Sequence, residues 1–410
     1  MTPSASRPNS AARYGVILNR RDIDRFCHTD LFAVELLAGF AAAGQPMRQF
    51  DYQADPERVL AALQDPQCRF FLCFNGFGAE LLSSPSNPGH LVSAFEAFRR
   101  PIVDFMHDCP GHETMEHQVH ATHTQRHLLI TDYGYAAIAC RLGLPNVRFV
   151  PSITFPTAFG GAPKASKDRD IEVLLPIGVS PPELSALRHR KDGDLKSRVY
   201  RDIFHAVTDA AVADLRVDPV TELDSASRCL DIALDFRRPD DRFLLSTILD
   251  FVKFERRRRL LRSVCRLPIM VIGDRDLADL PADSRFKFMP SRSATDLLLT
   301  MGNARCVLCP NPHMTGYHER PLSAFTAGAA VISSPNAVLE TNFVHRRHIL
   351  FYRNNEEAAE LVSSMLRQPK QIEDIAVCGR EQAFYYYKPA RLIEIVLSLL
   401  TLREEETRLS

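Results

Sequence analysis

The sequence predicts an α/β protein built from two doubly wound domains. Short apolar runs alternate with amphipathic segments along both halves of the chain, a pattern typical of parallel sheets whose strands are joined by helices. The chain has 410 residues, of which 45% are hydrophobic. That length is too great for one compact core and fits two domains. A segment rich in proline, glycine and polar residues, 151–170, separates the two series.

In the first half, the predicted strands are apolar and aromatic runs bounded by polar or turn residues. They cover residues 14–18, 47–52, 68–74, 102–106, 128–131 and 147–150. Helices are predicted at 31–42, 56–63, 91–98 and 134–142, where apolar residues recur at helical spacing. Because parallel strands need crossover connections, this order predicts a parallel sheet. The first strand runs into Asn-Arg-Arg-Asp rather than glycines, so a dinucleotide site is not expected.

In the second half, strands are predicted at 171–176, 269–272, 306–309 and 329–333. Helices are predicted at about 182–215 and at 243–264, 322–327, 356–366, 372–384 and 391–400. We therefore expect a disordered start at 1–12, a first domain at 13–155 and a linker at 156–170. A second domain follows at 171–385, and residues 386–410 form a helix and tail.

The composition excludes several classes of protein. The chain has 50 basic and 50 acidic side chains, and this balance gives no reason to expect a nucleic-acid partner. No apolar run approaches the roughly 18 residues that span a bilayer, and the first residues lack a hydrophobic signal core. The expectation is a cytoplasmic protein. Its ten cysteines lie mostly in apolar stretches, as reduced cysteines do.

Residues 305–336 carry the clearest chemical signal. An apolar run at 306–309 is stopped by proline, and a polar loop then leads to the tripeptide His-Glu-Arg at 318–320. Pro321 fits the first turn of a helix, and Gly328 ends that helix before the next strand. In a parallel sheet such a loop lies where ligands bind, and the free N–H groups of the helix start favour a phosphate.

These residues resemble a known family. The stretch HERPLSAFTAGAAVIS, followed by Leu-Glu at 339–340, HILFY at 348–352 and Glu-Glu at 356–357, is similar to the carboxyl-terminal domain of GT-B glycosyltransferases. Within these it is most similar to the bacterial CgeB-like (spore-maturation) group. The resemblance implies two Rossmann-like domains that face each other across a cleft, a C-terminal helix that crosses back to the first domain, and a nucleotide-sugar donor. It implies no cofactor and no catalytic metal.

The resemblance also implies which residues hold the donor. They lie in two segments, and they are Gly273, Arg275, His318, Glu319, Arg320, Leu322 and Ser323. Many GT-B enzymes carry a glutamate where this chain has Ser323. Glu319 is therefore expected to take over the ribose contact.

Two loops of the first domain follow predicted strands and should face the second domain. Asn75 and Gly76 follow one strand, and the sequence HDCPGH follows another. A transferase must remove a proton from an acceptor hydroxyl, so we predict His112 as the base, Asp108 as its orienting carboxylate and His107 as a further candidate. The alternative is structural, with Asp108 capping a helix and His112 on its first turn.

Three other patterns have a functional and a structural interpretation. His120, His123 and His127 would share a helical face, but without a recognised ligand spacing we expect a polar helix rather than a metal site. The arginines 256–259 could bind phosphate, although a solvated face or carboxylate partners are favoured. Cysteines 306 and 309 are expected to be buried strand residues.

The predicted function is transfer of a sugar from a nucleotide sugar to an unknown acceptor. Two alternatives stay open. A sugar-nucleotide epimerase or hydrolase on the same fold would keep the donor site and lose the acceptor groove. A non-catalytic nucleotide-sugar-binding protein would keep the fold and lack a working base.

Overall fold

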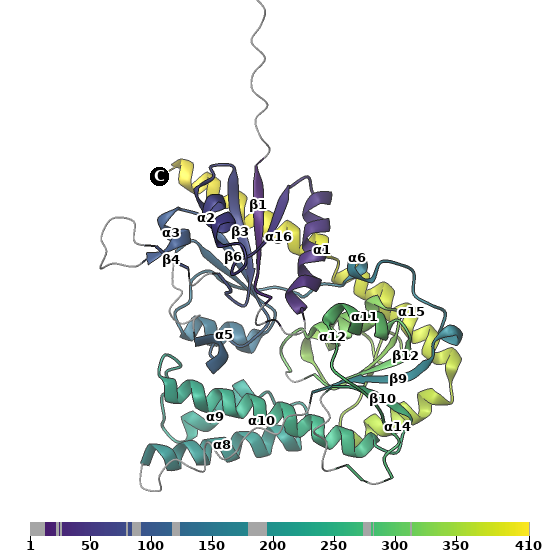
Figure 1. The fold of residues 1–410 in the computed structure, drawn as a ribbon. Coiled ribbons are helices and arrows are strands. Elements are labelled where there is room, and N and C mark those ends of the chain that lie inside the picture. Colours follow the sequence, from purple (N-terminus) through teal and green to yellow (C-terminus); the bar gives the residue numbers. More distant parts are fainter. Residues whose placement is uncertain are drawn as a thin grey trace, which may run out of the picture.

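The computed structural model describes residues 13–21, 24, 27–78, 81–83, 92–116, 124–178, 195–273, 280–281, 283–311 and 314–409. These residues form two six-stranded parallel sheets with helices around them (Figure 1). The predicted fold class is confirmed. The residues expected to be a disordered start, 1–12, lie outside the described part of the chain.

The first sheet has the strand order β2-β1-β3-β6-β7-β8. Its strands are β1 (Tyr14–Asn19), β2 (Met47–Asp51), β3 (Cys68–Phe74), β6 (Ile102–Met106), β7 (Arg126–Ile130) and β8 (Val147–Phe149). The connecting helices are α1 (His28–Ala42), α2 (Pro56–Gln64) and α5 (Tyr133–Arg141). The helix predicted at 91–98 is shorter, because β5 (Val92–Ser93) pairs with β4 (Leu82–Ser83) and leaves only α3 (Ala94–Ala97).

The second sheet has the order β11-β10-β9-β12-β13-β14. Its strands are β9 (Ile171–Pro176), β10 (Ile269–Ile272), β11 (Lys287–Met289), β12 (Ala304–Cys309), β13 (Ala330–Ser333) and β14 (Leu350–Phe351). The two short edge strands, β11 and β14, were not predicted. The helices are α11 (Ala294–Met301), α12 (Glu319–Thr326), α13 (Ala337–Asn342), α14 (Asn355–Leu366) and α15 (Pro369–Tyr386).

Three helices of the second half pack on the first sheet. They are α8 (Leu195–Ala213), α9 (Pro219–Cys229) and α10 (Pro239–Val264). Apolar residues of all three share one core with β6, β7 and α5. The last turns of α10, including Leu260 and Val264, instead enter the core below the second sheet. The 26-residue helix α10 therefore joins the two domains (Figure 1).

The segment between the domains and the end of the chain are also packed. Short turns α6 (Pro156–Phe159) and η2 (Ser166–Asp168) interrupt residues 151–170, and the amide of Thr154 donates to the carbonyl of Tyr387. Helix α16 (Pro389–Leu409) returns to the first domain, where Ile393 lies against Gly39 of α1. The predicted crossover helix is confirmed. One hydrophobic core consequently contains residues of both sheets.

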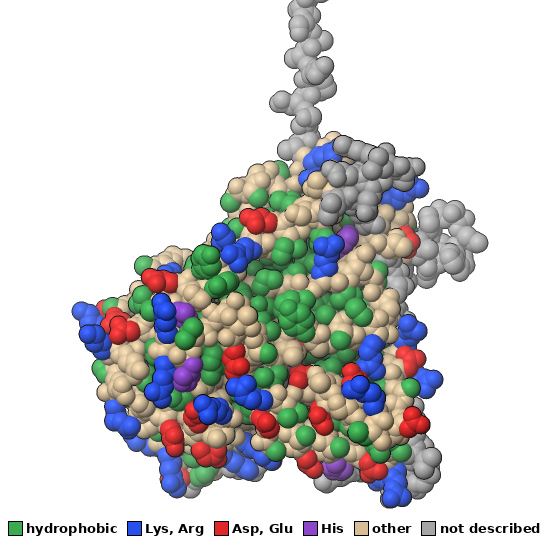
Figure 2. Space-filling model, turned by 180° about the vertical axis from the view of Figure 1, so that it is seen from behind, with side chains coloured by type: hydrophobic (Ala, Val, Ile, Leu, Met, Phe, Trp, Pro, Cys, Tyr) green, Lys and Arg blue, Asp and Glu red, His purple; other side chains and the backbone are tan. Residues whose placement is uncertain are grey.

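The outer surface carries charges of both signs. On the face seen in Figure 2, acidic and basic side chains are interspersed, in keeping with the formal net charge of zero. No helix within the described residues is long and apolar enough to cross a membrane.

Candidate functional site

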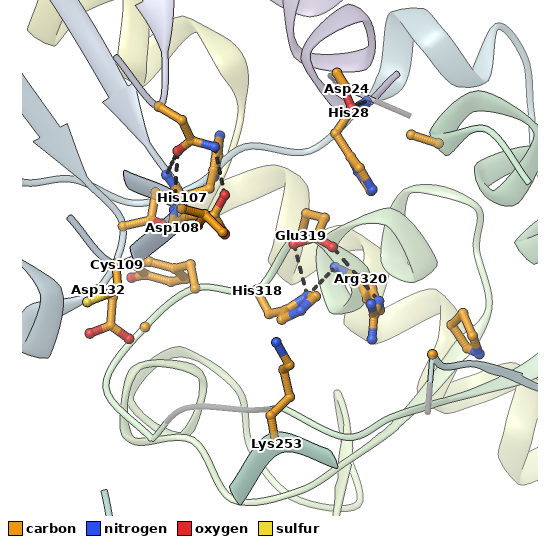
Figure 3. A pocket seen from close by; sticks show the side chains of 18 of the residues that line it. Asp24, His28, His107, Asp108, Cys109, Asp132, Lys253, His318, Glu319 and Arg320 are labelled. Carbon is orange, nitrogen blue, oxygen red and sulfur yellow. Dashed lines mark hydrogen bonds and ion pairs between the residues drawn. The ribbon is translucent and has the colours of Figure 1, made fainter. Parts of the chain in front are cut away.

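A cleft of about 740 Å³ lies between the two domains. Loops that follow β3, β6 and β7 of the first sheet form one wall, and loops that follow β9, β10 and β12 of the second form the opposite wall. Helix α10 closes the third side with Asp250, Lys253 and Arg257, and Figure 3 shows Lys253 pointing into the cleft. Since ligands of parallel α/β sheets bind at the carboxyl ends of the strands, both domains present their binding edges to the same space.

On the second domain, the predicted tripeptide forms the start of α12. His318 is the N-cap, and its Nδ1 accepts from the amide of Arg320 at 3.3 Å. The carboxylate of Glu319 lies 2.9 Å from His318 Nδ1 and 3.8 Å from Arg320 Nε. Burial alone would raise the pKa of Glu319, but His318 and Arg320 outweigh burial and hold it well below its ordinary value. Glu319 is therefore an ionised side chain in the cleft wall (Figure 3).

Two arginines make this wall positive. Arg257 reaches the cleft from α10, is only 6% exposed, and donates through Nη1 to the carbonyl of Gly178 at 3.1 Å. Burial and the nearby charge of Arg320 lower its pKa to about 9, so the guanidinium stays protonated at neutral pH. Arg257 Nε and Arg320 Nη1 are buried and have no hydrogen-bond partner among the described residues. Buried, unpaired cationic donors are costly, and an anionic ligand would satisfy them.

Helix α10 also contributes Asp250, whose carboxylate contacts one lysine and one histidine. Asp250 Oδ1 lies 2.5 Å from Lys253 Nζ, and Asp250 Oδ2 lies 3.4 Å from His112 Nε2. Burial would raise the pKa of Asp250, but the hydrogen bond from His112 and the charge of Lys253 lower it to about 2. Asp250 is thus a firmly ionised acceptor that fixes His112 and Lys253.

The HDCPGH loop is arranged differently from the sequence prediction. The carboxylate partner of His112 is Asp250, whereas Asp108 Oδ2 accepts from Asn75 Nδ2 at 2.8 Å. Asn75 Oδ1 accepts from the amides of His107 and Asp108, so the Asn75 side chain fixes the whole turn. Asp108 faces the open cleft, yet the enclosing walls limit its solvation and raise its pKa.

The structural alternative for this loop also needs correction. His112 is itself the N-cap of the short helix η1 (Glu113–Met115), and its Nδ1 lies 2.9 Å from Thr114 Oγ1. Asp108 caps no helix in the described structure. His107 lies between the rings of Phe32 and Phe105, with centroid distances of 4.3 and 4.6 Å. Burial lowers its pKa to about 4, so this imidazole is neutral.

Of the remaining residues predicted to lie in the site, some line the cleft and others do not. Gly273 lines the cleft, and a Cβ at this position would collide with the carbonyl oxygen of Ile177. Gly76, Leu322 and Ser323 do not line it. The amide of Gly76 donates to Asp104, which is paired with Arg126, and Leu322 and Ser323 are buried behind the α12 start. Arg275 lies outside the described residues.

Sequence reasoning missed the α10 residues. The four-arginine run was expected to be solvated or paired with carboxylates, and this holds for Arg258 and Arg259, which pair with Glu255. It is wrong for Arg256 and Arg257, which are buried. A signal existed, because Asp250, Lys253 and Arg257 recur at the i, i+3, i+7 spacing of one helix face.

A metal site finds no support among the described residues, where no group of three or more His, Cys, Asp or Glu side chains could hold an ion. His120 and His123 lie outside the described part of the chain, and His127 is in β7 rather than on a helix. Cys306 and Cys309 are buried in β12, where burial raises the pKa of each thiol to about 12. They are structural residues, as expected.

Comparisons with known proteins point to one class. Residues 256–398 match the family described as glycosyl transferase-like, and no curated protein matches the chain. A sucrose-phosphate synthase from Thermosynechococcus elongatus is similar in structure, with a TM-score of 0.53 and 12% identity over 97% of this chain and 100% of that one. The Anabaena protein HepE, in complex with UDP and glucose, gives a TM-score of 0.50 and 11% identity over 94% of this chain and 99% of that one.

The paired sheets and the interdomain cleft have the architecture of the GT-B glycosyltransferases. Within this class, the matched part of the second domain is glycosyl transferase-like, and it contains Arg257, Glu319 and Arg320 of the cleft wall.

Proposed function

We propose that this chain transfers a sugar from a nucleoside-diphosphate sugar, held by the second domain and α10, to an acceptor held by the first domain. The observation that carries the proposal is a pair of cleft cations, the buried Arg257 and the half-buried Arg320, each with one guanidinium nitrogen that is buried and has no hydrogen-bond partner among the described residues. A diphosphate supplies the acceptor oxygens and negative charge that these groups lack. The motif at 318–333 favours the CgeB-like group.

The donor would be oriented by complementary contacts. The diphosphate would face Arg257, Arg320 and the first amides of α12, and these cations would stabilise the leaving group as negative charge develops, without a metal ion. Glu319 is ionised and lines the cleft, whereas Ser323 does not. Glu319 is therefore the carboxylate that we propose for the ribose hydroxyls.

The transfer step needs a proton acceptor on the opposite wall. The acceptor oxygen bonds to the anomeric carbon of the sugar, the bond from that carbon to the diphosphate breaks, and the diphosphate leaves with the electron pair. We assign the acceptor proton to Asp108, because both ring nitrogens of His112 are engaged, by Thr114 and by Asp250. Asp108 is open to the cleft, and its raised pKa makes it a better base than an ordinary carboxylate.

The donor site is tested by calorimetry with a panel of nucleoside diphosphates and nucleotide sugars. At least one should bind the wild-type chain, and Arg320→Ala and Arg257→Lys should weaken it by about 10–100-fold, the effect of losing a charge-assisted hydrogen bond. Arg259→Ala is the matched control, since Arg259 pairs with Glu255 outside the cleft. Chelation of divalent ions should leave the affinity unchanged. Equal affinity in all three variants would remove the site from this wall.

A further inference from the structure

The two sides of the cleft carry opposite charge. Among the described residues that line it, every lysine and arginine belongs to α10 or the second domain, namely Lys253, Arg257, Arg292 and Arg320. The carboxylates on that side are Asp250 and Glu319. The first domain contributes the carboxyl groups of Asp24, Asp108 and Asp132, and no lysine or arginine in this described set. Burial raises the pKa of Asp132 to about 7, so the negative charge on this side comes chiefly from Asp24 and Asp108. This separation contrasts with the mixed charges of the outer face in Figure 2.

The first domain also lines the cleft with three histidines, His28, His107 and His112, and the last two do not offset the charge of the carboxylates. His107 is neutral at physiological pH because burial lowers its pKa to about 4. His112 is held by Asp250, which compensates any positive charge on its ring. Asp24 and Asp108 therefore make the acceptor side of the cleft more negative than the donor side, and the low-dielectric walls increase the effect of this difference on a bound ligand.

The carboxyl oxygens on this side of the cleft are also available to accept hydrogen bonds. Asp132 is 4% exposed, and its Oδ2 has no hydrogen-bond partner among the described residues. Asp108 uses one oxygen for Asn75 and is otherwise open to the cleft. One of the two side-chain N–H groups of Asn75 is donated to Asp108. The open Asp108 carboxylate accepts hydrogen bonds, so it favours ligand groups that donate, as hydroxyl and ammonium groups do and phosphate does not.

We propose that the acceptor half of the cleft selects a hydroxyl-bearing molecule that is uncharged or carries an amine, and rejects one with a phosphate or carboxylate near the reacting hydroxyl. The inference rests on the proposed transferase function, and it names the acceptor class. A phosphate on the donor side is neutralised by arginines, whereas a second phosphate opposite would face Asp108, and the nearby cation Lys253 is already paired with Asp250. One unit charge about 10 Å away at an effective dielectric constant of about 20 corresponds to roughly tenfold in affinity.

The first test is a matched set of acceptors that differ in charge: a hexose, the corresponding 2-amino sugar and the hexose 6-phosphate. Release of nucleoside diphosphate above the donor-only rate is measured with the donor identified by calorimetry. The hexose or the amino sugar should accelerate release at least tenfold more than the phosphate. Faster release with the phosphate than with either partner overturns the inference, while donor binding and the transferase proposal would still stand.

A second measurement needs no turnover. Wild-type protein and Asp108→Lys are saturated with the same nucleoside diphosphate, and the melting temperature is followed as inorganic phosphate is added. Phosphate stabilises proteins in general, and that effect cancels in the comparison. Only Asp108→Lys should gain a further, saturable stabilisation, because the new ammonium supplies the missing countercharge. The inference fails if the wild-type protein gains as much, or if neither protein gains.

Discussion

Asp132 of the first domain and Gly316 of the second form an antiparallel backbone bridge across the base of the cleft. The amide of Tyr133 donates to the carbonyl of Thr315 at 3.2 Å, and the amide of Tyr317 donates to the carbonyl of Thr131 at 2.8 Å. Thr315 Oγ1 also donates to Asp132 Oδ1 at 3.2 Å. The loop that carries His318, Glu319 and Arg320 is therefore fixed by the opposite domain.

The bridge predicts a specific role for Gly316. A Cβ at this position would collide with the Asp132 carboxylate, so Gly316→Ala should separate the two turns and displace the start of α12. We expect a destabilisation of about 1–3 kcal/mol, as for overpacking, together with several-fold weaker donor binding. The measurements are thermal unfolding and calorimetry. Gly161→Ala is the matched control, because its Cβ would meet nothing within 4 Å, and equal behaviour of the two variants would contradict the prediction.

The Asp132 carboxyl also predicts a pH dependence. Burial raises its pKa to about 7, with a further contribution from the nearby Asp218 carboxylate. Between about pH 4 and pH 7 the unfolded chain loses this proton while the folded chain keeps it, so stability falls as pH rises. The loss is at most about 4 kcal/mol, from three pKa units at about 1.4 kcal/mol each.

Asp132→Asn should remove this slope, because the amide keeps the capping oxygen for α5 and does not ionise. Melting temperatures of both proteins are compared from pH 4 to pH 8. The variant should gain stability relative to the wild type up to about pH 7, with a constant difference above that value. Parallel curves over the whole range would show that Asp132 has an ordinary pKa.

The strands and the donor loop could be predicted from the sequence because each is a local pattern. Buried parallel strands are continuous apolar runs, such as residues 68–74 and 102–106, and all six strands of the first sheet were found this way. The His-Glu-Arg start of α12 was found because proline and glycine mark the helix ends. The two- and three-residue edge strands, β14 and β11, are too short to produce such a pattern.

The third side of the cleft could not be predicted, because it depends on packing between distant segments. Sequence order assigns α8, α9 and α10 to the second domain, yet their apolar faces lie on β6, β7 and α5. Only that packing brings Asp250 to His112, 138 positions away in the chain (250 − 112). Consecutive arginines also point around the helix at about 100° intervals, so a run such as 256–259 contains both buried and exposed members.

Arg256 is one of the buried arginines of this run, and its contacts lead to a prediction about the stability of the folded protein. It is 5% exposed, and its guanidinium donates to the carbonyls of Ala211, Asp214 and Val217 at the end of α8. Arg256→Met would leave these carbonyls without that donor, which should cost about 3 kcal/mol. Arg258→Met removes a partly exposed pair with Glu255 and should cost less than about 1 kcal/mol. Urea denaturation compares the two, and similar midpoints would show that the Arg256 bonds are dispensable.

The identity of the proton acceptor gives the last prediction. If Asp108 takes the proton, Asp108→Asn should lower the transfer rate by roughly 10²–10⁴ and leave donor affinity nearly unchanged, because the donor contacts lie on the opposite wall. His112→Asn should have a smaller effect, near tenfold, because it disturbs the Asp250 contact without removing the base.

The transfer rate of the wild-type protein should rise with pH through the raised pKa of Asp108 and then become constant. Rates and calorimetric affinities are measured on variants whose melting temperatures match the wild type. If His112→Asn loses the larger factor and Asp108→Asn stays active, the proton passes to His112, and Asp108 serves to hold the acceptor.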